Sequence, residues 1–364
     1  MRDLTGDQRR DPYARTRARA TIGSVLAICL AVLEPLPALA QSGPGETFHV
    51  SKVDAVGGEG SWDYVQFDPA TDRLFVARVG GVLALDVRSM KPVGTIPALA
   101  GTRVHGVALA EDLGLGMTGN GADRTSTVFD LKTLRTTAEV ALPYAADAVT
   151  YDGFSHAAIA VGADDPHVMA FDPKTGKLVA DLKMPGSPEA SVPDGHGQLY
   201  VTLSDTNEVG RIDTRSWTVA DHWAVGGGCE EPTPIAMDTA RGRLFVGCRS
   251  KVLVVVDPGR RTPVAVVPIG EGVDSLAFDP ARGLIFVSCN DGTVTVIAAQ
   301  GASSYSVAQT VKTQAGARTM ALDPGDDRLF LPAADKGPML PKVGDIPGRP
   351  AIVPETFRIL TVSR

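Results

Sequence analysis

The chain has 364 residues, of which 44% are hydrophobic and 21% charged, proportions that are ordinary for a soluble globular protein. Its formal net charge is −7, and no run of Lys or Arg occurs after residue 40. Nucleic-acid binders carry clustered basic residues, so the composition disfavours nucleic acid as a partner.

The first 40 residues are predicted to be a secretory signal peptide. A region with six Arg is followed by the apolar run 22–33 and by small residues at Ala38 and Ala40, which predicts cleavage before Gln41. The apolar run is too short to span a membrane. We therefore expect a mature chain, residues 41–364, in the periplasm or outside the cell, with 29 basic against 38 acidic residues.

Short strand-like segments recur along the mature chain at intervals of 41 to 44 residues. Each closes on an Asp turn such as Asp68-Pro69 or Asp152-Gly153, where the carboxylate accepts hydrogen bonds from backbone N–H groups just ahead. The second repeat has Ala110 instead of the closing Asp. A repeat of this length built from short strands predicts an all-β protein, a seven-bladed β-propeller.

The fifth repeat illustrates the strands expected in a blade. Its predicted strands are 234–237, 244–248, 252–257 and 264–268, with a turn at 238–242. The seventh repeat lacks a fourth strand, and the segment 47–53 near the N-terminus resembles an outer strand. We expect this segment to complete the last blade and so close the ring, which removes exposed sheet edges.

The last blade also carries an insertion, residues 333–355, between its second and third strands. It is rich in Pro and Gly, and we expect no strand within it. Loops of this length inside compact domains are usually functional or disordered. Because it should open on the face where the inner strands begin, we interpret it as a lid over the channel; a surface loop without function is the alternative.

A polar residue occupies the same position at the start of each inner strand. With the closing turns aligned, these residues are Asp63, His105, Asp147, Glu189, Thr233, Asp274 and Arg318. Inner strands run beside the central channel, so we expect a ring of these side chains on one face. Four carboxylates around a narrow axis need a cation or raised pKa values, and the ring contains a single Arg. The ring therefore predicts a site for a small molecule or a divalent cation.

The most specific candidate within the ring is a metal site. His105 lies in the blade between Asp63 and Asp147, and these three residues are the predicted metal ligands. Oxygen ligands favour Ca²⁺, Mg²⁺ or Mn²⁺, while the His admits Zn²⁺ or Fe²⁺.

Two alternatives to simple binding remain open from the sequence. In one, the ring only bonds neighbouring backbone groups and water and so locks the blades together. In the other it is catalytic: His105 is the general base or a metal ligand, Glu189 or Glu231 carries a proton, and Arg318 anchors an anionic substrate. Glu231 is also the expected carboxylate of the fifth blade, because Thr233 holds the ring position there.

Residues beside the ring are expected to extend the site. Arg78 and Arg249 lie at the ends of second strands, on the same face, and are candidate ligand-binding residues. Trp62 and Tyr64 flank Asp63, and strand alternation should turn both away from the channel to pack between blades or line the rim.

Three cysteines of the mature chain fall near this face. Cys229 and Cys248 are predicted to form a disulfide, as is usual in an oxidising compartment. Cys289 occupies in the sixth blade the place of Cys248 in the fifth, and is either a buried thiol or an alternative partner.

Several stretches resemble one known family: residues 60–64 (GSWDY), 104–107 (VHGV), 229–233 (CEEPT), 244–249 (LFVGCR) and 316–324 (GARTMALDP). The chain resembles a YncE-like protein of the bacterial YVTN-repeat β-propellers over essentially its whole mature length. That resemblance implies an exported seven-bladed propeller without an assured activity. More distant propellers include lactone-cleaving lyases and lactonases with a divalent metal on the axis.

The sequence contains no GxSxG elbow, no glycine-rich nucleotide loop after a strand and no CxxCH, so no nucleotide, flavin or haem is expected. We expect a monomer that binds a small molecule or cation at the axial face. A metal-assisted lyase or hydrolase and a protein-interaction scaffold are the alternative functions.

Overall fold

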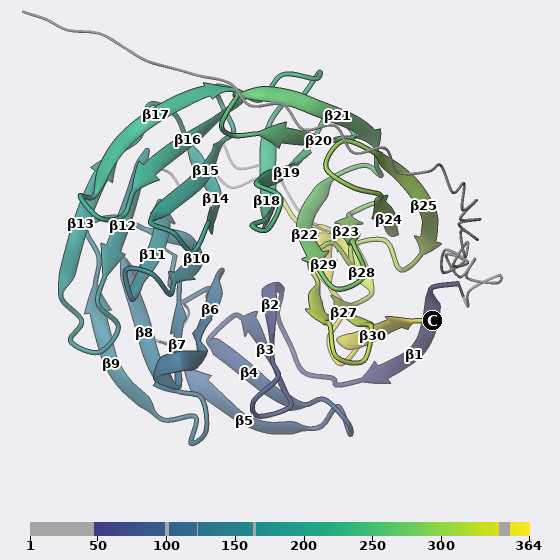
Figure 1. Cartoon of the computed structure of the whole chain (residues 1–364). Coiled ribbons are helices and arrows are strands. Elements are labelled where there is room, and N and C mark those ends of the chain that lie inside the picture. Colours follow the sequence, from purple (N-terminus) through teal and green to yellow (C-terminus); the bar gives the residue numbers. More distant parts are fainter. Residues whose placement is uncertain (1–46, 99–101, 122, 163–164, 342–349) are drawn as a thin grey trace, which may run out of the picture. The chain divides into compact units, whose positions relative to one another are not determined.

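The computed structural model describes residues 47–98, 102–121, 123–162, 165–341 and 350–364. Within them, seven four-stranded antiparallel sheets are arranged in a ring, and the fold is the predicted seven-bladed β-propeller (Figure 1). The signal peptide and its cleavage site before Gln41 lie outside the described residues. Within those residues, no helix has the length and apolar character needed to cross a membrane.

Each blade runs from an inner strand at the axis to an outer strand at the rim. The strands of the first three blades are β2 (Trp62–Asp68), β3 (Arg73–Arg78), β4 (Gly81–Asp86) and β5 (Pro92–Pro97); β6 (Val107–Ala110), β7 (Leu115–Thr118), β8 (Thr125–Asp130) and β9 (Thr136–Ala141); β10 (Ala146–Asp152), β11 (Ala157–Gly162), β12 (His167–Phe171) and β13 (Leu178–Lys183).

The next three blades follow the same order. They comprise β14 (Pro188–Pro193), β15 (Gln198–Leu203), β16 (Glu208–Asp213) and β17 (Thr218–Ala224); β18 (Pro232–Asp238), β19 (Arg243–Cys248), β20 (Val252–Asp257) and β21 (Thr262–Pro268); β22 (Val273–Asp279), β23 (Leu284–Cys289), β24 (Thr293–Ala299) and β25 (Tyr305–Lys312). The fifth blade therefore matches its predicted strands to within two residues.

The last blade combines both ends of the described chain. It contains β26 (Ala321–Asp323), β27 (Arg328–Ala333), β30 (Arg358–Ser363) and, as its outer strand, β1 (His49–Ala55). Strand β1 pairs antiparallel with β30, from His49 opposite Ser363 to Ala55 opposite Arg358. The prediction that an N-terminal strand closes the ring is confirmed.

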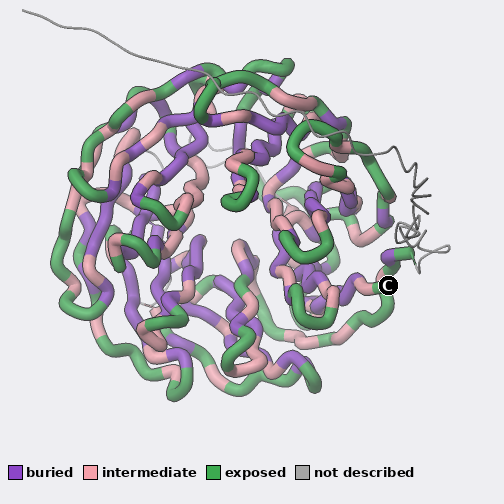
Figure 2. Tube along the Cα trace, viewed as in Figure 1, coloured by how far each residue is buried: buried purple, intermediate pink, exposed green. Residues whose placement is uncertain are grey.

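The core lies between the blades, formed by the middle strands. Strands β11 and β23 are buried along their whole length, whereas outer strands such as β5 are mostly exposed (Figure 2). Phenylalanines fill the space between adjacent blades; for example, the rings of Phe75 and Phe129 lie 5.6 Å apart across the first and second blades. A strand buried on both faces reads as a continuous run of Val, Ile, Leu and Phe, which is the pattern seen here.

The Asp turns form as expected. Asp68 Oδ1 accepts a hydrogen bond from the backbone N–H of Ala70 at 3.0 Å, and Asp279 does the same for Ala281 at 2.9 Å. In the second blade, where Ala110 replaces the Asp, the turn is instead a 3₁₀ helix, η1 (Glu111–Leu113), closed by Gly114 at φ 66°. Glycine tolerates this left-handed conformation without steric cost.

The insertion of the last blade corrects one prediction. It was expected to hold no strand, but β28 (Lys336–Met339) and β29 (Pro350–Ile352) pair antiparallel as a small hairpin. Residues 342–349 of the insertion lie outside the described residues. Pro is tolerated at the edges of a two-stranded ribbon because its missing N–H can face solvent, so the Pro-rich composition did not exclude strands.

Candidate functional site

A cavity of about 820 Å³ opens at the axial face where the inner strands begin. It is lined by six of the seven ring residues, Asp63, His105, Asp147, Glu189, Asp274 and Arg318. Arg249 lines it as well, and the inserted hairpin contributes Lys336, Leu340, Pro350, Ala351 and Ile352. The register of the repeat therefore identified six residues that face one cavity.

A bulge at the start of the inner strand aims the ring residue at the axis. In the first blade Trp62 pairs with Arg78 and Val65 with Val76, so Asp63 and Tyr64 together oppose one residue of β3. Similar register shifts occur in β10, β14, β18 and β22. A bulge interrupts the alternation of side chains. The prediction that Tyr64 faces away from the channel is therefore wrong, because Tyr64 lines the cavity. Trp62 also lines the cavity, although its side chain is buried and packs against the ring of Phe357.

Asp63 is the centre of a charged network. Its Oδ2 accepts hydrogen bonds from Arg103 Nη2 at 3.1 Å and His105 Nδ1 at 3.0 Å, and its Oδ1 accepts one from Arg318 Nη2 at 3.3 Å. Burial alone would raise the pKa of Asp63, but the bond from His105 and the two guanidinium charges outweigh it and lower the pKa. Asp63 is therefore a carboxylate held by three cationic groups.

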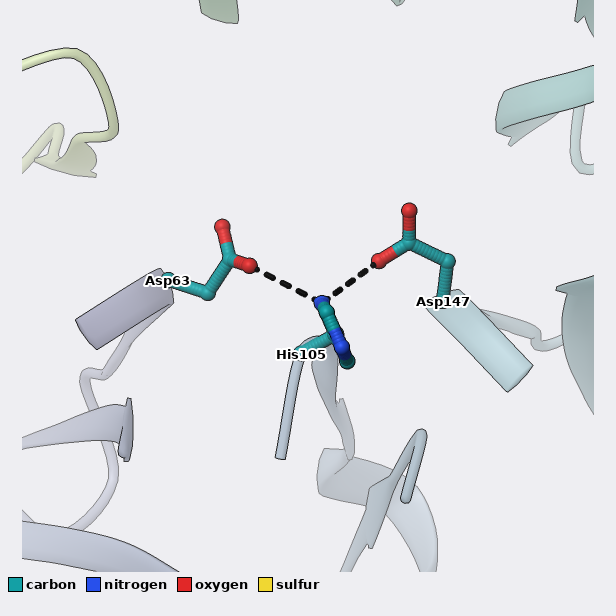
Figure 3. Close-up of side chains that lie close together, drawn as sticks. All are labelled: Asp63, His105 and Asp147. Carbon is teal, nitrogen blue, oxygen red and sulfur yellow. Dashed lines mark hydrogen bonds and ion pairs between the residues drawn. The ribbon is translucent and has the colours of Figure 1, made fainter. Parts of the chain in front are cut away.

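His105 bridges two carboxylates (Figure 3). Its Nδ1 lies 3.0 Å from Asp63 Oδ2 and 3.1 Å from Asp147 Oδ1. Burial lowers the pKa of the imidazole, but the bonds to Asp147 and Asp63 more than reverse this and raise it to about 9. At neutral pH His105 is thus an imidazolium, a proton donor rather than the general base that the catalytic interpretation assigned.

The same three residues are the one group among the described residues with the geometry of a metal site. Asp63, His105 and Asp147 each offer a ligand atom, and these atoms lie within 4.8 Å of one another. Carboxylate oxygen and imidazole nitrogen suit Mn²⁺ or Zn²⁺. The donor set fits, but a metal there would replace the proton on His105 and sit next to the guanidiniums bound to Asp63.

Arg318 joins the seventh blade to its neighbours on both sides. Its Nε donates to Asp274 Oδ2, in addition to the bond from its Nη2 to Asp63. Burial raises the pKa of Asp274, and the charge of Arg318 opposes that rise. The prediction that Arg318 anchors an anionic substrate stays a prediction, since both of its arms already hold carboxylates of the protein.

Glu189 and Tyr64 are further polar groups of the cavity. Burial raises the pKa of Glu189, and the charge of Asp147 raises it further. Burial also raises the pKa of Tyr64 well above its usual range, together with the charges of Asp274, Asp147, Asp63 and Glu189. The phenol therefore keeps its proton and is available as a hydrogen-bond donor.

Three predicted site residues do not line the cavity. Thr233 is 2% exposed and its hydroxyl donates to the carbonyl of Glu231 at 3.1 Å. Glu231 does not replace it: its side chain is 63% exposed and lies 3.7 Å from Arg249 Nε. Arg78 donates to the carbonyl of Glu59 and lies over the ring of Phe357, which makes it a packing residue.

Side-chain hydroxyl groups also join one blade to the next. The Thr202 hydroxyl donates to the Thr233 carbonyl at 2.9 Å, Ser288 Oγ donates to the Arg318 carbonyl at 2.5 Å, and Thr319 Oγ1 donates to the Asp63 carbonyl at 2.8 Å. These hydroxyls hold backbone groups beside the ring, and the ion pairs of His105 and Arg318 add contacts between neighbouring blades.

Two cationic residues of the site were missed in the sequence. Arg103 precedes the ring position of the second blade by two residues and carries no signal of its own, and Lys336 lies in the insertion. The cavity therefore contains more positive charge than the ring alone implied.

The disulfide between Cys229 and Cys248 is present, and Cys289 is a buried free thiol. The disulfide ties the loop before β18 to the end of β19, directly before Arg249. It thereby restrains the segment from which the Arg249 side chain reaches the cavity.

Comparison with known proteins supports the fold and nothing finer. No protein-family model matches the chain, and no curated protein is significantly similar to it. Among solved structures 1830 chains are similar, so the fold is too widespread to indicate a function. One, described as "Crystal Structure of Mitotic Checkpoint Complex", aligns with a TM-score of 0.68 and 16% identity over 91% of this chain and 99% of that chain. Likeness at this identity shows a shared propeller fold only.

Proposed function

We propose that the protein binds a small polar molecule in the axial cavity. The observation that carries this proposal is that six ring residues from six blades line one cavity of about 820 Å³. Small-molecule sites commonly have volumes of roughly 300–1,000 Å³, so this cavity holds a metabolite-sized ligand. Burying charged groups is costly unless they are paired and hydrogen-bonded. His105 and Arg318 meet this need by linking neighbouring blades, while the cavity that they line opens at the axial face.

The test is a thermal-shift screen of small polar metabolites against the wild type and Glu189→Gln. The variant keeps the shape of a cavity-lining side chain and removes its charge. We expect at least one compound to stabilise the wild type and to stabilise the variant by a different amount. Glu208→Gln is the matched control, since Glu208 lies on β16 beside His222, outside the cavity. A set of hits that stabilises all three proteins equally would count against the axial site.

A divalent cation at Asp63, His105 and Asp147 is the second candidate. It is supported by the three ligand atoms within 4.8 Å of one another. Because the metal must displace the proton from His105, its affinity should rise as the pH increases toward about 9. The test is elemental analysis and titration with Ca²⁺, Mg²⁺, Mn²⁺ and Zn²⁺ at pH 7 and pH 9, repeated for His105→Ala and Asp147→Ala. Absence of stoichiometric metal in the wild type at both pH values would rule this candidate out.

We also propose that the protein is exported and is related to the YncE-like propellers. The disulfide supports a location outside the reducing cytoplasm. The seven-bladed ring closed by β1 agrees with that kinship at the level of fold. Expression in a Gram-negative host, followed by fractionation and N-terminal sequencing, should give a periplasmic chain that begins at Gln41. A cytoplasmic chain that keeps residues 1–40 would contradict the export proposal.

A further inference from the structure

The charged groups of the cavity fall into two sets. The first is a connected network: Asp63, Asp147 and Asp274 are held by Arg103, His105 and Arg318 through contacts of 3.3 Å or less. Each of the three carboxylates contacts at least one of the three basic side chains. The carboxylates of this network therefore have basic partners within the protein.

The second set contains the remaining charges, Glu189, Arg249 and Lys336. The carboxylate nearest Arg249 is Glu231, at 3.7 Å with both side chains more than half exposed, and such a pair is weak because solvent screens it. Among the residues that the structure describes, no carboxylate forms an ion pair with Lys336. Among the described residues that line the cavity outside the network, two cations therefore face one carboxylate.

The two cations lie on either side of the sixth blade. Arg249 follows β19 of the fifth blade, and its charge acts on Glu189 and Asp274, so its guanidinium extends toward the axis. Lys336 begins β28 in the seventh blade. Asn290 lies between them in the sixth blade, where its backbone N–H donates to Gly272 at 2.8 Å and its carbonyl accepts from Gly316 at 2.9 Å. Arg249, Asn290 and Lys336 all line the cavity.

The position of Lys336 depends on Gly316. A Cβ atom at residue 316 would lie 2.8 Å from Lys336 Cε and 3.1 Å from Nζ, and the backbone there has φ +96°. Both facts make a side chain at 316 unfavourable. The absence of a side chain at 316 leaves space in which the Lys336 ammonium lies at the cavity wall.

We infer that the ligand of the axial cavity is a small organic anion, whose carboxylate or phosphate group is bound by Arg249 and Lys336 over the fifth to seventh blades. This inference rests on the proposed binding function and specifies its ligand class. Guanidinium and ammonium groups bind these oxyanions through charge-assisted hydrogen bonds. Across the cavity, Glu189 and the Tyr64 phenol are placed for hydrogen bonds to the neutral part of the ligand. The sequence indicated a small molecule or a divalent cation, because it revealed four carboxylates and one Arg in the ring.

The test uses two small nitroxides that differ in charge, one bearing a carboxylate and the other an amine. Each is added at low ionic strength to the full protein, and the paramagnetic relaxation of backbone amides is measured by NMR. We expect the carboxylate nitroxide to relax the amides of Gly272, Asn290 and Gly316 on the order of threefold more than the amine nitroxide, each normalised to amides of the outer strands. Normalisation removes the general attraction of cations to an acidic protein.

Substitutions test whether Arg249 and Lys336 cause the preference for the carboxylate nitroxide. Arg249→Ala and Lys336→Ala should each lower the ratio toward one, whereas Lys174→Ala, which removes an exposed charge from the turn before β13, should leave it unchanged. A ratio of one or below in the wild type overturns the inference. If the amine nitroxide enters the cavity instead, the binding proposal survives and only the ligand class is wrong. If neither probe relaxes cavity amides above background, both proposals fail.

Discussion

His105 of the second blade lies between carboxylates of the first and third blades, and its protonation should be directly measurable. The structure raises the imidazole pKa to about 9, because Asp147 and Asp63 both accept from Nδ1. Titration of the ring by NMR should give this value in the wild type. In Asp147→Asn one of the two acceptors loses its charge, and the pKa should fall by more than one unit. An unchanged pKa would mean that Asp147 does not contact the imidazolium in solution.

The same pKa predicts how stability depends on pH. Since the folded-state pKa lies above the unfolded value of 6.5, the contribution is fully present below pH 6.5 and is lost as the pH rises through about 9. A shift of this size corresponds to roughly 3 kcal/mol. Urea unfolding at several pH values should show this loss in the wild type. His105→Gln should remove the pH-dependent part, and a variant that keeps the full slope would show that another group titrates there.

Single residues were predictable where the repeat fixed them and not elsewhere. Six of the seven ring positions face the cavity because each follows a blade connection at the same offset. Tyr64 could not be placed, because a bulge in β2 breaks the alternation on which the prediction relied. Arg103 and Lys336 were missed because their positions depend on long side chains from a neighbouring turn and from an insertion, for which the repeat provides no register.

Among the elements, β1 closes the ring by pairing with β30 and through the residue that precedes it. Phe48, which precedes the strand, is 5% exposed and packs edge-on against Phe286 at 5.3 Å. The Gln309 side chain of β25 accepts from the Phe48 N–H and donates to its carbonyl. Phe48→Ala should lower the free energy of unfolding by about 3–5 kcal/mol, measured by urea denaturation. Val53→Ala, at a 55% exposed position of the same strand, should change it little; equal effects would show that β1 is not buried as described.

The disulfide should stabilise the fifth blade as a single element. It closes a loop between residues 19 positions apart, for which chain entropy predicts about 3 kcal/mol of stabilisation. The double substitution Cys229→Ser and Cys248→Ser should lower the free energy of unfolding by this amount, and reduction of the wild type should have a similar effect. Because Cys289 is a buried thiol, Cys289→Ser in the oxidised protein is the control. If the double variant retained wild-type stability, the disulfide would not restrain the unfolded chain.

The inserted hairpin shows where composition misleads. Its Pro-rich sequence predicted no strand, yet β28 and β29 pair and Ile352 packs against the core between the seventh and first blades. An isolated two-stranded ribbon is marginally stable. Contacts with the rest of the fold therefore stabilise it, and such contacts cannot be read from a local sequence.

The whole ring was the most predictable feature of the molecule, because seven copies of one pattern leave little freedom in how they pack. Blades join through the core and through backbone bonds around the axis. The Tyr64 N–H donates to the His105 carbonyl at 3.2 Å, and the Gly106 N–H donates to the Asp147 carbonyl at 3.0 Å. The Thr319 hydroxyl donates to the Asp63 carbonyl and so joins the seventh blade to the first. The ligand chemistry was less predictable, because it depends on charges that converge from several blades and only the ring positions share a register.

A closed ring should unfold as one cooperative unit, and its tryptophans can test this. Trp62 lies in the first blade, whereas Trp217 and Trp223 lie at the fourth, and β1 and β30 join the two ends of the chain. Two variants are unfolded with urea: Trp62→Phe, and the double variant Trp217→Phe and Trp223→Phe. In each variant, the transition followed by fluorescence should coincide with the transition followed by circular dichroism. Thr319→Val removes one hydroxyl hydrogen bond between the seventh and first blades. It should lower the free energy of unfolding by about 1 kcal/mol while the protein keeps a single transition. Separate midpoints for the two sets of tryptophans would show that the blades unfold independently, as in an open array of repeats, and that the β1–β30 pairing does not couple them.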